Sequence, residues 1–591
     1  MAKAAPKLPR WDLGELFAGP DDPKLDAALE ALVAEAAAFE AEHQGALAAG
    51  PSAVALQRAL DEYEALSRRA YRPMAYAQLL FSSDTQNPAY GALLQRVREA
   101  ISAANVHLVF FELALGRLPA ALGEAAELAP YRHHLEQARR RARHQLGEAE
   151  ERILVETANV RGPAFVRLFN ELQGRALYHV ERDGGCQTLP QSEALALLRE
   201  PERDVRRRAA AALTQGFKHN APLVTFIYNT LIHEHAVLDR LRGFKRPEDA
   251  RHLDNDLPPA AVEAMVDACQ AHQGAVAEHY ETKRRLLGLK SLDHADRYAP
   301  VGAPAAKIPF DRAREIVLDA FSRFDPCMAE AVAPFFERGW IDAAPARGKS
   351  GGAYCAAVTP DHHPYVFMNY TGTLDDVMTL AHELGHALHG VLARERHMLD
   401  FRPALPLAET ASTFAEMLVF DHLLAGLDRR EDQLALLCGK VENLIATVFR
   451  QVAIFRFERE AHARRRDRGE LPAEAFNELW QSTQQALYGD SLRLGQDHAW
   501  WWGYIPHLMQ SPFYVYAYAF GELLVLSLYA RYQQEGAGFV ENYVKLLAAG
   551  GSRPPAELVA ELGFDVEDPD FWAAGCRLIA ARVAQARDLA D

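Results

Sequence analysis

The chain has 591 residues, of which 49% are hydrophobic and 24% charged, a globular balance that excludes a disordered or collagen-like chain. Its 64 Lys and Arg residues against 80 Asp and Glu residues give a net charge of −16, which argues against binding to nucleic-acid phosphates. The length alone would allow roughly four domains. The 23 histidines are an ample supply of potential metal ligands.

The N-terminus lacks the continuous apolar stretch of a secretory signal, because Pro6 and Pro9 interrupt it. The six cysteines include no Cys-x-x-Cys pair, so we expect neither a thiolate zinc site nor a disulfide framework. The most apolar stretch, residues 512–530, contains Tyr514, Tyr516, Tyr518, Gly521 and Glu522, which favours a buried core helix over a membrane span. We therefore expect a cytoplasmic protein that binds neither membranes nor nucleic acids.

Helical spacing of Ala, Leu and Glu residues predicts long helices at residues 25–47, 53–81 and 90–115. Short apolar runs at residues 165–169 and 176–180 indicate a small strand element. Helices are expected to resume at residue 191 and to continue to about residue 338.

Two further strand candidates, residues 353–358 and 365–370, are joined by the turn signal Pro360-Asp361. After them the chain has helical patterning to its end, so we predict a mainly α protein with one small sheet. Three arginine-rich runs lie in predicted helices with acidic neighbours and are interpreted as solvent-exposed faces: residues 139–143, 206–208 and 464–466.

A helix predicted at residues 374–392 carries the pentapeptide His-Glu-Leu-Gly-His at residues 382–386. Thr373, followed three residues later by Asp376, is a capping box that would start this helix. Apolar residues at helical spacing supply a stripe for burial: Val377, Leu380, Ala381, Leu384 and Leu388.

The pentapeptide has the spacing of a metal site. At positions i and i+4, His382 and His386 project from one face of the helix, so that two imidazoles can bind one metal ion. Glu383 is the next residue, and its carboxylate can reach a water in the open position of that metal and take its proton.

A catalytic zinc site usually has three protein ligands and one open position. The metzincin pattern is excluded, because it needs Gly and His where this chain has His389 and Leu392. A helix predicted at residues 407–424 carries Glu409 and Glu416 on one face, two turns apart. We assign Glu409 as the third ligand and Glu416 as the acceptor for a ligand histidine's other nitrogen. Three competing ligands lie in the predicted connection before this helix: Glu395, His397 and Asp400.

With other segments of the chain, these residues resemble the M3 zinc metallopeptidases, specifically the oligoendopeptidase F branch. The other segments that carry the resemblance are Trp11-Asp12-Leu13, Tyr131-Arg132-His133, Phe169-Asn170-Glu171-Leu172, Gly352-Ala353-Tyr354-Cys355, residues 408–414, Ile505-Pro506-His507 and residues 511–518. The resemblance implies an almost wholly helical, entwined two-lobed fold with a small sheet beside the motif helix. It also implies a deep internal channel that admits short peptides.

The resemblance divides the chain into an N-terminal helical domain, residues 1–190, and a zinc peptidase domain, residues 191–591. It implies that a C-terminal His/Tyr segment faces the zinc and stabilises the tetrahedral intermediate. His507 and Tyr518 are the residues expected in this role, with Tyr514 next as a substrate contact.

We therefore expect a zinc-dependent endopeptidase of short unstructured oligopeptides, with one zinc ion per chain and Glu383 as general base and acid. The strand candidate from Tyr365 to Tyr370 is expected to pair with extended substrate backbone. Two alternatives remain. A dipeptidyl carboxypeptidase of the same family would need a cationic group for the substrate's C-terminus, and a non-catalytic peptide-binding protein would not need Glu383. Monomer and homo-oligomer are both compatible with the sequence.

Overall fold

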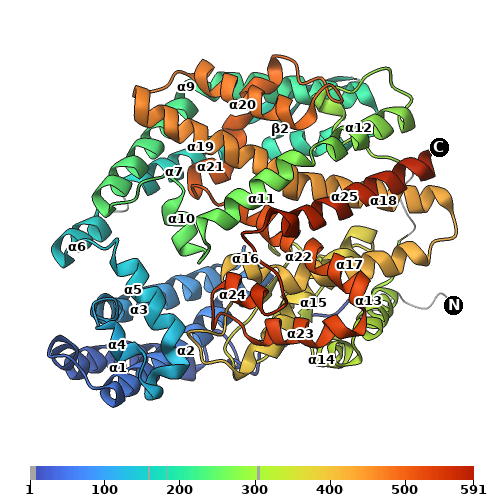
Figure 1. Cartoon of the computed structure of the whole chain (residues 1–591). Coiled ribbons are helices and arrows are strands. Elements are labelled where there is room, and N and C mark those ends of the chain that lie inside the picture. Colours follow the sequence, from blue (N-terminus) through green and yellow to red (C-terminus); the bar gives the residue numbers. More distant parts are fainter. Residues whose placement is uncertain (1–7, 158–159, 183, 303–306) are drawn as a thin grey trace. The chain divides into compact units, whose positions relative to one another are not determined.

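The computed structural model describes residues 8–157, 160–182, 184–302 and 307–591. Helices make up 71% of the chain, which confirms the mainly α prediction (Figure 1). The described residues form two small sheets rather than the single sheet predicted, because the strands near residues 180 and 360 do not pair with each other. In the described part of the chain, no helix combines the length and apolarity that crossing a membrane requires.

The chain forms two compact units, and each unit is built from three separate stretches of sequence. The first unit comprises residues 1–143, 305–426 and 531–564, and the second comprises residues 144–304, 427–530 and 565–591. The predicted division at residue 190 concerns sequence domains rather than compact units, and it stays a prediction.

The first unit contains three long N-terminal helices, the motif helix and a three-stranded sheet. Its elements are α1 (Pro23–Ala48), α2 (Ala53–Ser83), α3 (Pro88–Leu115), α4 (Ala120–Gly123), η1 (Ala126–Tyr131), α5 (Arg132–Ala142), α13 (Phe310–Phe324), α14 (Pro326–Glu337), β3 (Ile341–Asp342), β4 (Tyr354–Ala356), β5 (Tyr365–Phe367), α15 (Leu374–Leu392), η5 (Ala393–Glu395), α16 (Leu405–Ala408), α17 (Thr410–Ala425), α23 (Ala537–Ala548) and α24 (Pro555–Ala560).

The second unit is helical apart from one hairpin. Its elements are α6 (Glu148–Glu156), α7 (Gly162–Arg175), β1 (Leu177–Arg182), β2 (Gly185–Pro190), α8 (Gln191–Ala196), η3 (Leu197–Arg199), α9 (Arg203–Arg242), α10 (Asp249–Asp254), α11 (Pro259–Ala271), α12 (Gly274–Leu286), η4 (His294–Asp296), α18 (Arg430–Leu444), η6 (Ile445–Phe449), α19 (Arg450–Arg468), α20 (Ala473–Tyr488), η7 (Asp497–Tyr504), α21 (Pro506–Gln510) and α25 (Pro569–Ala590). Helix α22 (Tyr516–Glu535) begins in this unit and ends in the first.

Side-chain caps start the three N-terminal helices where the sequence predicts them. Asp22, Ser52 and Asn87 each accept a hydrogen bond from a backbone N–H in the first turn of α1, α2 and α3 respectively. The apolar faces of these helices share one core, which includes Leu32, Phe39, Leu60, Leu108 and Phe111. The predicted helices at residues 25–47, 53–81 and 90–115 are confirmed.

Strands β1 and β2 form an antiparallel hairpin, which confirms the strand predicted at residues 176–180. The strand predicted at residues 165–169 is wrong, because these residues lie inside α7. Apolar side chains recur there every three or four positions, at Phe165, Phe169 and Leu172, which is the spacing of a helix.

The small sheet of the first unit has the strand order β3-β5-β4. Strand β5 pairs in parallel with β3 and antiparallel with β4, so both of its edges are occupied. The sheet contacts α15 through β4 and β5, which confirms a small sheet beside the motif helix. The two-residue strand β3 was not predicted, since two residues carry no alternation to detect.

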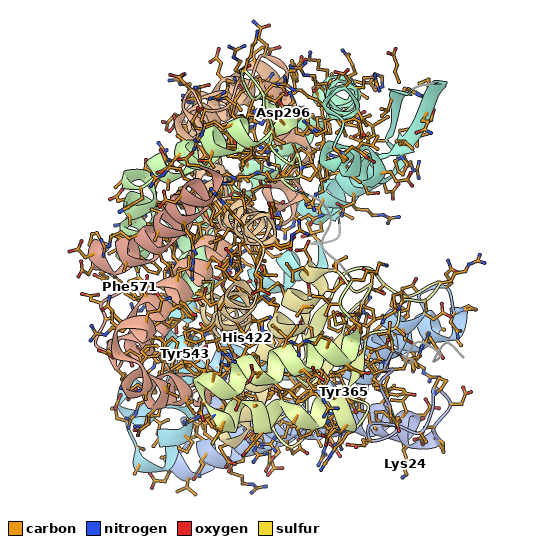
Figure 2. All side chains as sticks on the ribbon, turned by 90° about the vertical axis from the view of Figure 1, so that its right-hand side faces the viewer. Lys24, Asp296, Tyr365, His422, Tyr543 and Phe571 are labelled. Carbon is orange, nitrogen blue, oxygen red and sulfur yellow. The ribbon has the colours of Figure 1, made fainter. Side chains whose placement is uncertain are left out.

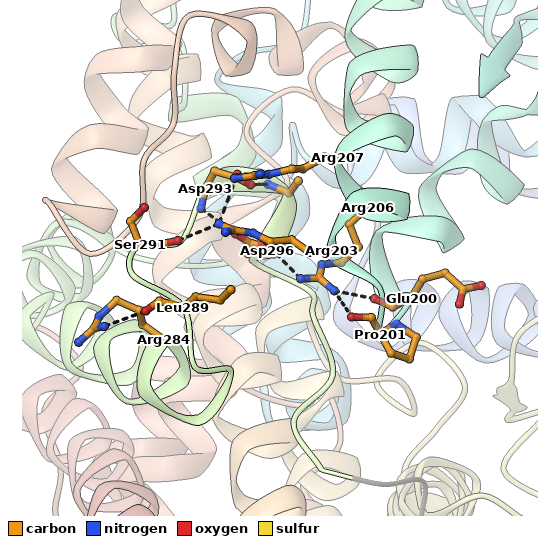
Figure 3. A network of polar contacts seen from close by, with 11 residues as sticks. Glu200, Pro201, Arg203, Arg206, Arg207, Arg284, Leu289, Ser291, Asp293 and Asp296 are labelled. Atoms are coloured by element: carbon orange, nitrogen blue, oxygen red, sulfur yellow. Dashed lines mark hydrogen bonds and ion pairs between the residues drawn. The ribbon is translucent and has the colours of Figure 1, made fainter. Parts of the chain in front are cut away.

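A buried ion-pair network holds the start of α9 in the second unit (Figure 3). The fully buried Asp296 carboxylate accepts hydrogen bonds from Arg203 and, at 2.9 Å, from Arg206. Arg206 also donates to the carbonyls of Glu200 and Pro201. The prediction that Arg206 lies on a solvent-exposed face is therefore wrong. Its buried charge is paired with Asp296, an acidic residue distant in sequence.

Glu458 on α19 gives a pH-dependent prediction for stability. Burial raises the pKa of Glu458 to about 8, although the N–H of Phe513, which donates to its Oε1 at 2.9 Å, lowers it. The unfolded chain therefore releases this proton at lower pH than the folded chain, so stability falls as the pH rises from about 4.5 to about 8. We expect Glu458→Gln to reduce that fall by on the order of 1 kcal/mol or more.

Melting temperatures of the wild type and Glu458→Gln at both ends of this pH range would measure the effect. Glu460→Gln, a change at an exposed carboxylate on the same helix, is the matched control. If all three proteins lost the same stability with rising pH, the raised pKa of Glu458 would be wrong.

Candidate metal centre

Helix α15 begins with the predicted capping box. The Thr373 side chain accepts from the N–H of Asp376 at 3.2 Å, and the Asp376 carboxylate accepts from the N–H of Thr373 at 2.9 Å. All five predicted stripe residues are fully buried. This fixed start and buried face set the rotation of the helix, and with it the direction of its histidines.

Gly385 lies where α15 comes closest to α17. A Cβ atom at Gly385 would lie 2.5 Å from Cα of Ser412 and 2.6 Å from the carbonyl oxygen of Ala411, too close for any side chain. The glycine between the two motif histidines therefore allows the backbone contact that brings α17 to the motif.

His382, His386 and Glu409 form one group in the first unit. Oε2 of Glu409 lies 3.3 Å from Nε2 of His382 and 3.4 Å from Nε2 of His386. One donor atom from each of the three residues lies within 4.8 Å of the others. With ligand bonds of about 2.1 Å, donor atoms of a tetrahedral zinc site lie about 3.4 Å apart, so the spacing fits.

Glu409 lies at the junction between α16 and α17 rather than inside a single helix. Ser412 donates from Oγ to Oε2 of Glu409 at 2.9 Å, which orients the carboxylate. Tyr543 of α23, labelled in Figure 2, donates from its hydroxyl to the carbonyl of Thr410 at 3.0 Å and stacks on Phe414. These contacts fix the start of α17 and therefore the position of Glu409.

Glu416 contacts the other nitrogen of His382. Nδ1 of His382 lies 2.6 Å from Oε1 of Glu416, so the ring donates there and directs Nε2 toward Glu409. This is the arrangement in which a carboxylate fixes the tautomer of a metal-binding histidine.

The charges of the group depend on one another. Burial lowers the pKa of His382, but hydrogen bonds to Glu409 and Glu416 outweigh it and hold the pKa well above its usual value. Burial alone would raise the pKa of Glu409, but hydrogen bonds from His382 and His386 hold it below its usual range. Lone pairs that attract a proton in this way also attract a divalent cation.

Glu383 lines one cavity together with His382, His386 and Glu409, but it is not one of the three grouped donors. Its side chain is 4% exposed, and its Oε2 atom is buried with no hydrogen-bond partner among the described residues. Burial raises the pKa of Glu383 to about 6, although His382 and His386 lower it. A buried carboxylate with an unused oxygen is suited to accept a proton.

The three competing ligands contact other groups. His397 lies 3.0 Å from Asp400 and donates to the carbonyl of Pro130 at 2.7 Å. The Glu395 side chain is 87% exposed and lies 3.9 Å from Arg394. None of the three belongs to the group of donor atoms around Glu409.

His382, His386 and Glu409, called the triad from here on, line a cavity of about 720 Å³ together with Glu383. Its wall also includes residues that the sequence did not single out: Tyr71, Met74, Ala75, Gln78 and Leu79 of α2, and Arg402. The Arg402 guanidinium stacks 4.0 Å from the Tyr71 ring centre and donates to the carbonyl of Ala357 at 2.7 Å. In sequence, apolar residues three or four apart on α2 cannot be told from an ordinary core stripe.

The structure corrects the expected role of the strand at residues 365–370. Strand β5 cannot pair with a substrate, because β3 and β4 occupy both of its edges. Tyr365, labelled in Figure 2, is 0% exposed and packs in a hydrophobic core, and Tyr370 is 3% exposed and donates to the carbonyl of Ile308. The cavity instead contacts β4, the edge strand.

His507, Tyr514 and Tyr518 form a cluster in the second unit. Nε2 of His507 lies 3.2 Å from the Tyr518 hydroxyl, and the Tyr514 ring lies 5.2 Å from the Tyr518 ring. Burial lowers the pKa of His507, so the imidazole is neutral at neutral pH. The structure thus brings these three together, and their action at the metal centre stays a prediction.

The donor set fits a zinc ion. Two imidazole nitrogens and one carboxylate are the ligands of many catalytic zinc sites, and imidazole and carboxylate donors both bind this metal well. Glu383, whose Oε2 atom has no hydrogen-bond partner among the described residues, lines the same cavity.

Comparisons with known proteins show the family and the fold of the chain. The sequence model described as "Peptidase family M3" matches residues 196–578, and the one described as "Oligopeptidase F" matches residues 112–175. "Oligopeptidase PepF" of Bacillus subtilis (strain 168) is 24% identical over 589 residues, which cover 98% of this chain and 87% of that protein. Two crystal structures share the fold. A Chlamydophila abortus protein gives a TM-score of 0.87 at 24% identity over 98% of both chains. Oligoendopeptidase-F from Enterococcus faecium gives a TM-score of 0.73 at 22% identity, over 95% of this chain and 98% of that chain.

Proposed function

The chain belongs to peptidase family M3, and from this premise we propose that it is a zinc-dependent endopeptidase of short, unstructured oligopeptides. Family membership makes it a metallo-endopeptidase, a hydrolase of peptide bonds. The observation that carries the finer proposal is the grouping of His382, His386 and Glu409 beside Glu383 on one cavity.

Nε2 of His382, Nε2 of His386 and the Glu409 carboxylate would hold one zinc ion per chain. When bound there, zinc would polarise the scissile carbonyl and lower the pKa of water. Glu416 is a positioning residue, since it holds the tautomer of His382 in which Nε2 carries the free lone pair.

Glu383 would act first as base and then as acid. Its Oε2 atom accepts a proton from the attacking water, and the protonated carboxyl then delivers that proton to the leaving amine. Burial supports this double role, because it brings the pKa of the carboxyl closer to neutral pH. His507 and Tyr518 are proposed as donors to the oxyanion, a role worth about 3 kcal/mol per donor in other enzymes.

Substrate backbone would add to the edge strand β4, whose residues line the cavity. Main-chain pairing supplies affinity that does not depend on side chains, which suits an enzyme acting on peptides of varied sequence. A cavity of about 720 Å³ has the size of pockets that enclose small ligands, which favours short peptides over folded proteins.

A dipeptidyl carboxypeptidase remains the alternative, and one observation bears on it. Arg402 brings a guanidinium to the cavity wall, where it could bind a substrate carboxylate. The guanidinium already donates to Ala357 and stacks on Tyr71, so we favour a role in shaping the wall.

Chelation and product mapping test the proposed function. We expect cleavage of a short peptide to stop after treatment with a chelator and to return on addition of zinc. With a peptide blocked at both ends, mass spectrometry should show cuts at internal bonds. The same peptide with a free C-terminus is the matched control. Cleavage of the unblocked peptide alone, by loss of dipeptides, would favour the carboxypeptidase.

A further inference from the structure

A second group of potential metal ligands lies in the first unit and shares no residue with the triad. His362 and His363 lie in the connection between β4 and β5, and Glu15 lies in the N-terminal segment before α1. Oε2 of Glu15 is 3.1 Å from Nε2 of His363 and 3.9 Å from Nε2 of His362. One donor atom from each of the three residues lies within 4.8 Å of the others.

Backbone contacts fix the tautomers of both histidines. Nδ1 of His362 donates to the carbonyl of His363 at 3.0 Å, and Nδ1 of His363 donates to the carbonyl of Pro364 at 2.9 Å. A carbonyl oxygen can only accept, so the proton of each neutral ring is on Nδ1 and the lone pair is on Nε2. Both rings therefore direct a lone pair toward the carboxylate of Glu15, which also offers only lone pairs.

A proton on Nε2 of His363 would relieve the 3.1 Å contact with Glu15 but not the contact of His362. A second proton, on His362, would make two adjacent imidazolium ions. The ring centres of His362 and His363 are 4.3 Å apart, and the side chains are 6% and 12% exposed. Burial and like-charge repulsion both oppose that state. Nε2 of His362 is also buried without a hydrogen-bond partner in the described structure. One divalent cation among the three donors removes all of these costs.

The triad and a third cluster show what separates a metal site from an ion pair. The triad has the same donor set, with separations of 3.3 and 3.4 Å, and a fixed tautomer on His382. In the cluster of Glu42, His43 and Glu62, by contrast, the Arg58 guanidinium binds both carboxylates, so half of their charge is already neutralised. Glu15 differs, because its ion pairs with described residues are those with His362 and His363, and neither Lys nor Arg takes part in them.

We propose that Glu15, His362 and His363 form a second metal site, which binds zinc or a similar divalent transition-metal ion. Two imidazole nitrogens and a carboxylate suit such ions, and the exposed Glu15 leaves room for water as a further ligand. Leu13 and Leu16, which flank Glu15, pack in the same core as Tyr365. The metal would therefore link the N-terminal segment around Glu15 to the connection between β4 and β5, in the sheet that borders the cavity.

Zinc counting in variants tests the site. Glu409→Gln, which removes a charged ligand of the triad, should leave about one bound zinc per chain, held by the second site. In that background, Glu15→Gln and His362→Gln should each weaken or abolish the remaining binding in a calorimetric titration with zinc. Glu62→Gln is the matched control and should leave it unchanged. The proposal is wrong if Glu409→Gln binds no zinc, or if neither substitution affects the zinc that remains.

Tryptophan fluorescence gives an independent readout. The His363 ring stacks on Trp340 with ring centres 3.7 Å apart, so Cu²⁺ bound to His363 would lie close enough to quench this indole. In the Glu409→Gln background we expect saturable quenching by Cu²⁺ that falls when Trp340→Phe or Glu15→Gln is added. Quenching of equal depth in all three proteins would overturn the assignment.

Discussion

Glu383→Gln is expected to lower kcat/KM for peptide cleavage by about 1000-fold or more while leaving the zinc content unchanged. Glutamine fills the same space on α15 but cannot accept a proton from water. The ligand atoms of His382, His386 and Glu409 are untouched, so metal binding should persist. Steady-state rates on a short peptide and metal analysis of the same sample would measure both quantities.

The control for this variant is Glu395→Gln, which removes a solvent-exposed carboxylate just beyond the end of α15. Its rate should match that of the wild type. Substantial turnover by Glu383→Gln would mean that another group takes the proton, and loss of zinc would mean that the substitution disturbs the site itself.

Gly385→Ala is expected to damage the metal centre although residue 385 binds nothing. The new methyl group would lie within 2.6 Å of the α17 backbone, which cannot move aside as a flexible side chain could. Overpacking of this kind costs about 1–3 kcal/mol, and a shift of about 1 Å at a catalytic site costs about 100-fold in rate. We therefore expect lower thermal stability, weaker zinc binding and slower cleavage together.

Gly439→Ala is the matched control for this prediction. Gly439 lies within α18, and a Cβ atom there would meet nothing within 4 Å. Because alanine favours a helix over glycine by about 1 kcal/mol, this variant should be as stable as the wild type or more stable. If both alanine variants kept full activity and stability, the close approach of α15 and α17 would be wrong.

Local sequence patterns predict the helices and the candidate metal ligands. Helical spacing locates α1, α2 and α3, a capping box and helical spacing locate α15, and the spacing of the motif singles out His382 and His386. These features depend on residues within a few turns of one another, which a sequence displays directly. Glu409 requires an inference across a loop, and its grouping with the two histidines agrees with that inference.

Features that depend on contacts distant in sequence were missed or wrong. Arg206 was predicted to lie on the surface because nothing nearby in sequence reveals Asp296 as its partner. The place of β5 between two other strands follows from pairing with β3, a strand too short to detect. The run at residues 165–169 shows another limit, since four apolar residues around Arg167 fit a strand and a helix equally until their neighbours are counted.

In the proposed enzyme, the contribution of α2 to the cavity would separate the choice of substrate from the chemistry. Residues 71–79 shape the wall, yet they supply no metal ligand and precede both stretches matched by the family models. Glu64 of the same helix accepts from the N–H of Met398 at 2.9 Å, which ties α2 to the loop leading to Glu409. Substitutions at Tyr71, Met74 or Gln78 should therefore alter which peptides are accepted while the reaction at the metal stays the same. Selectivity and catalysis could accordingly diverge independently, and an engineer could redesign one without rebuilding the other.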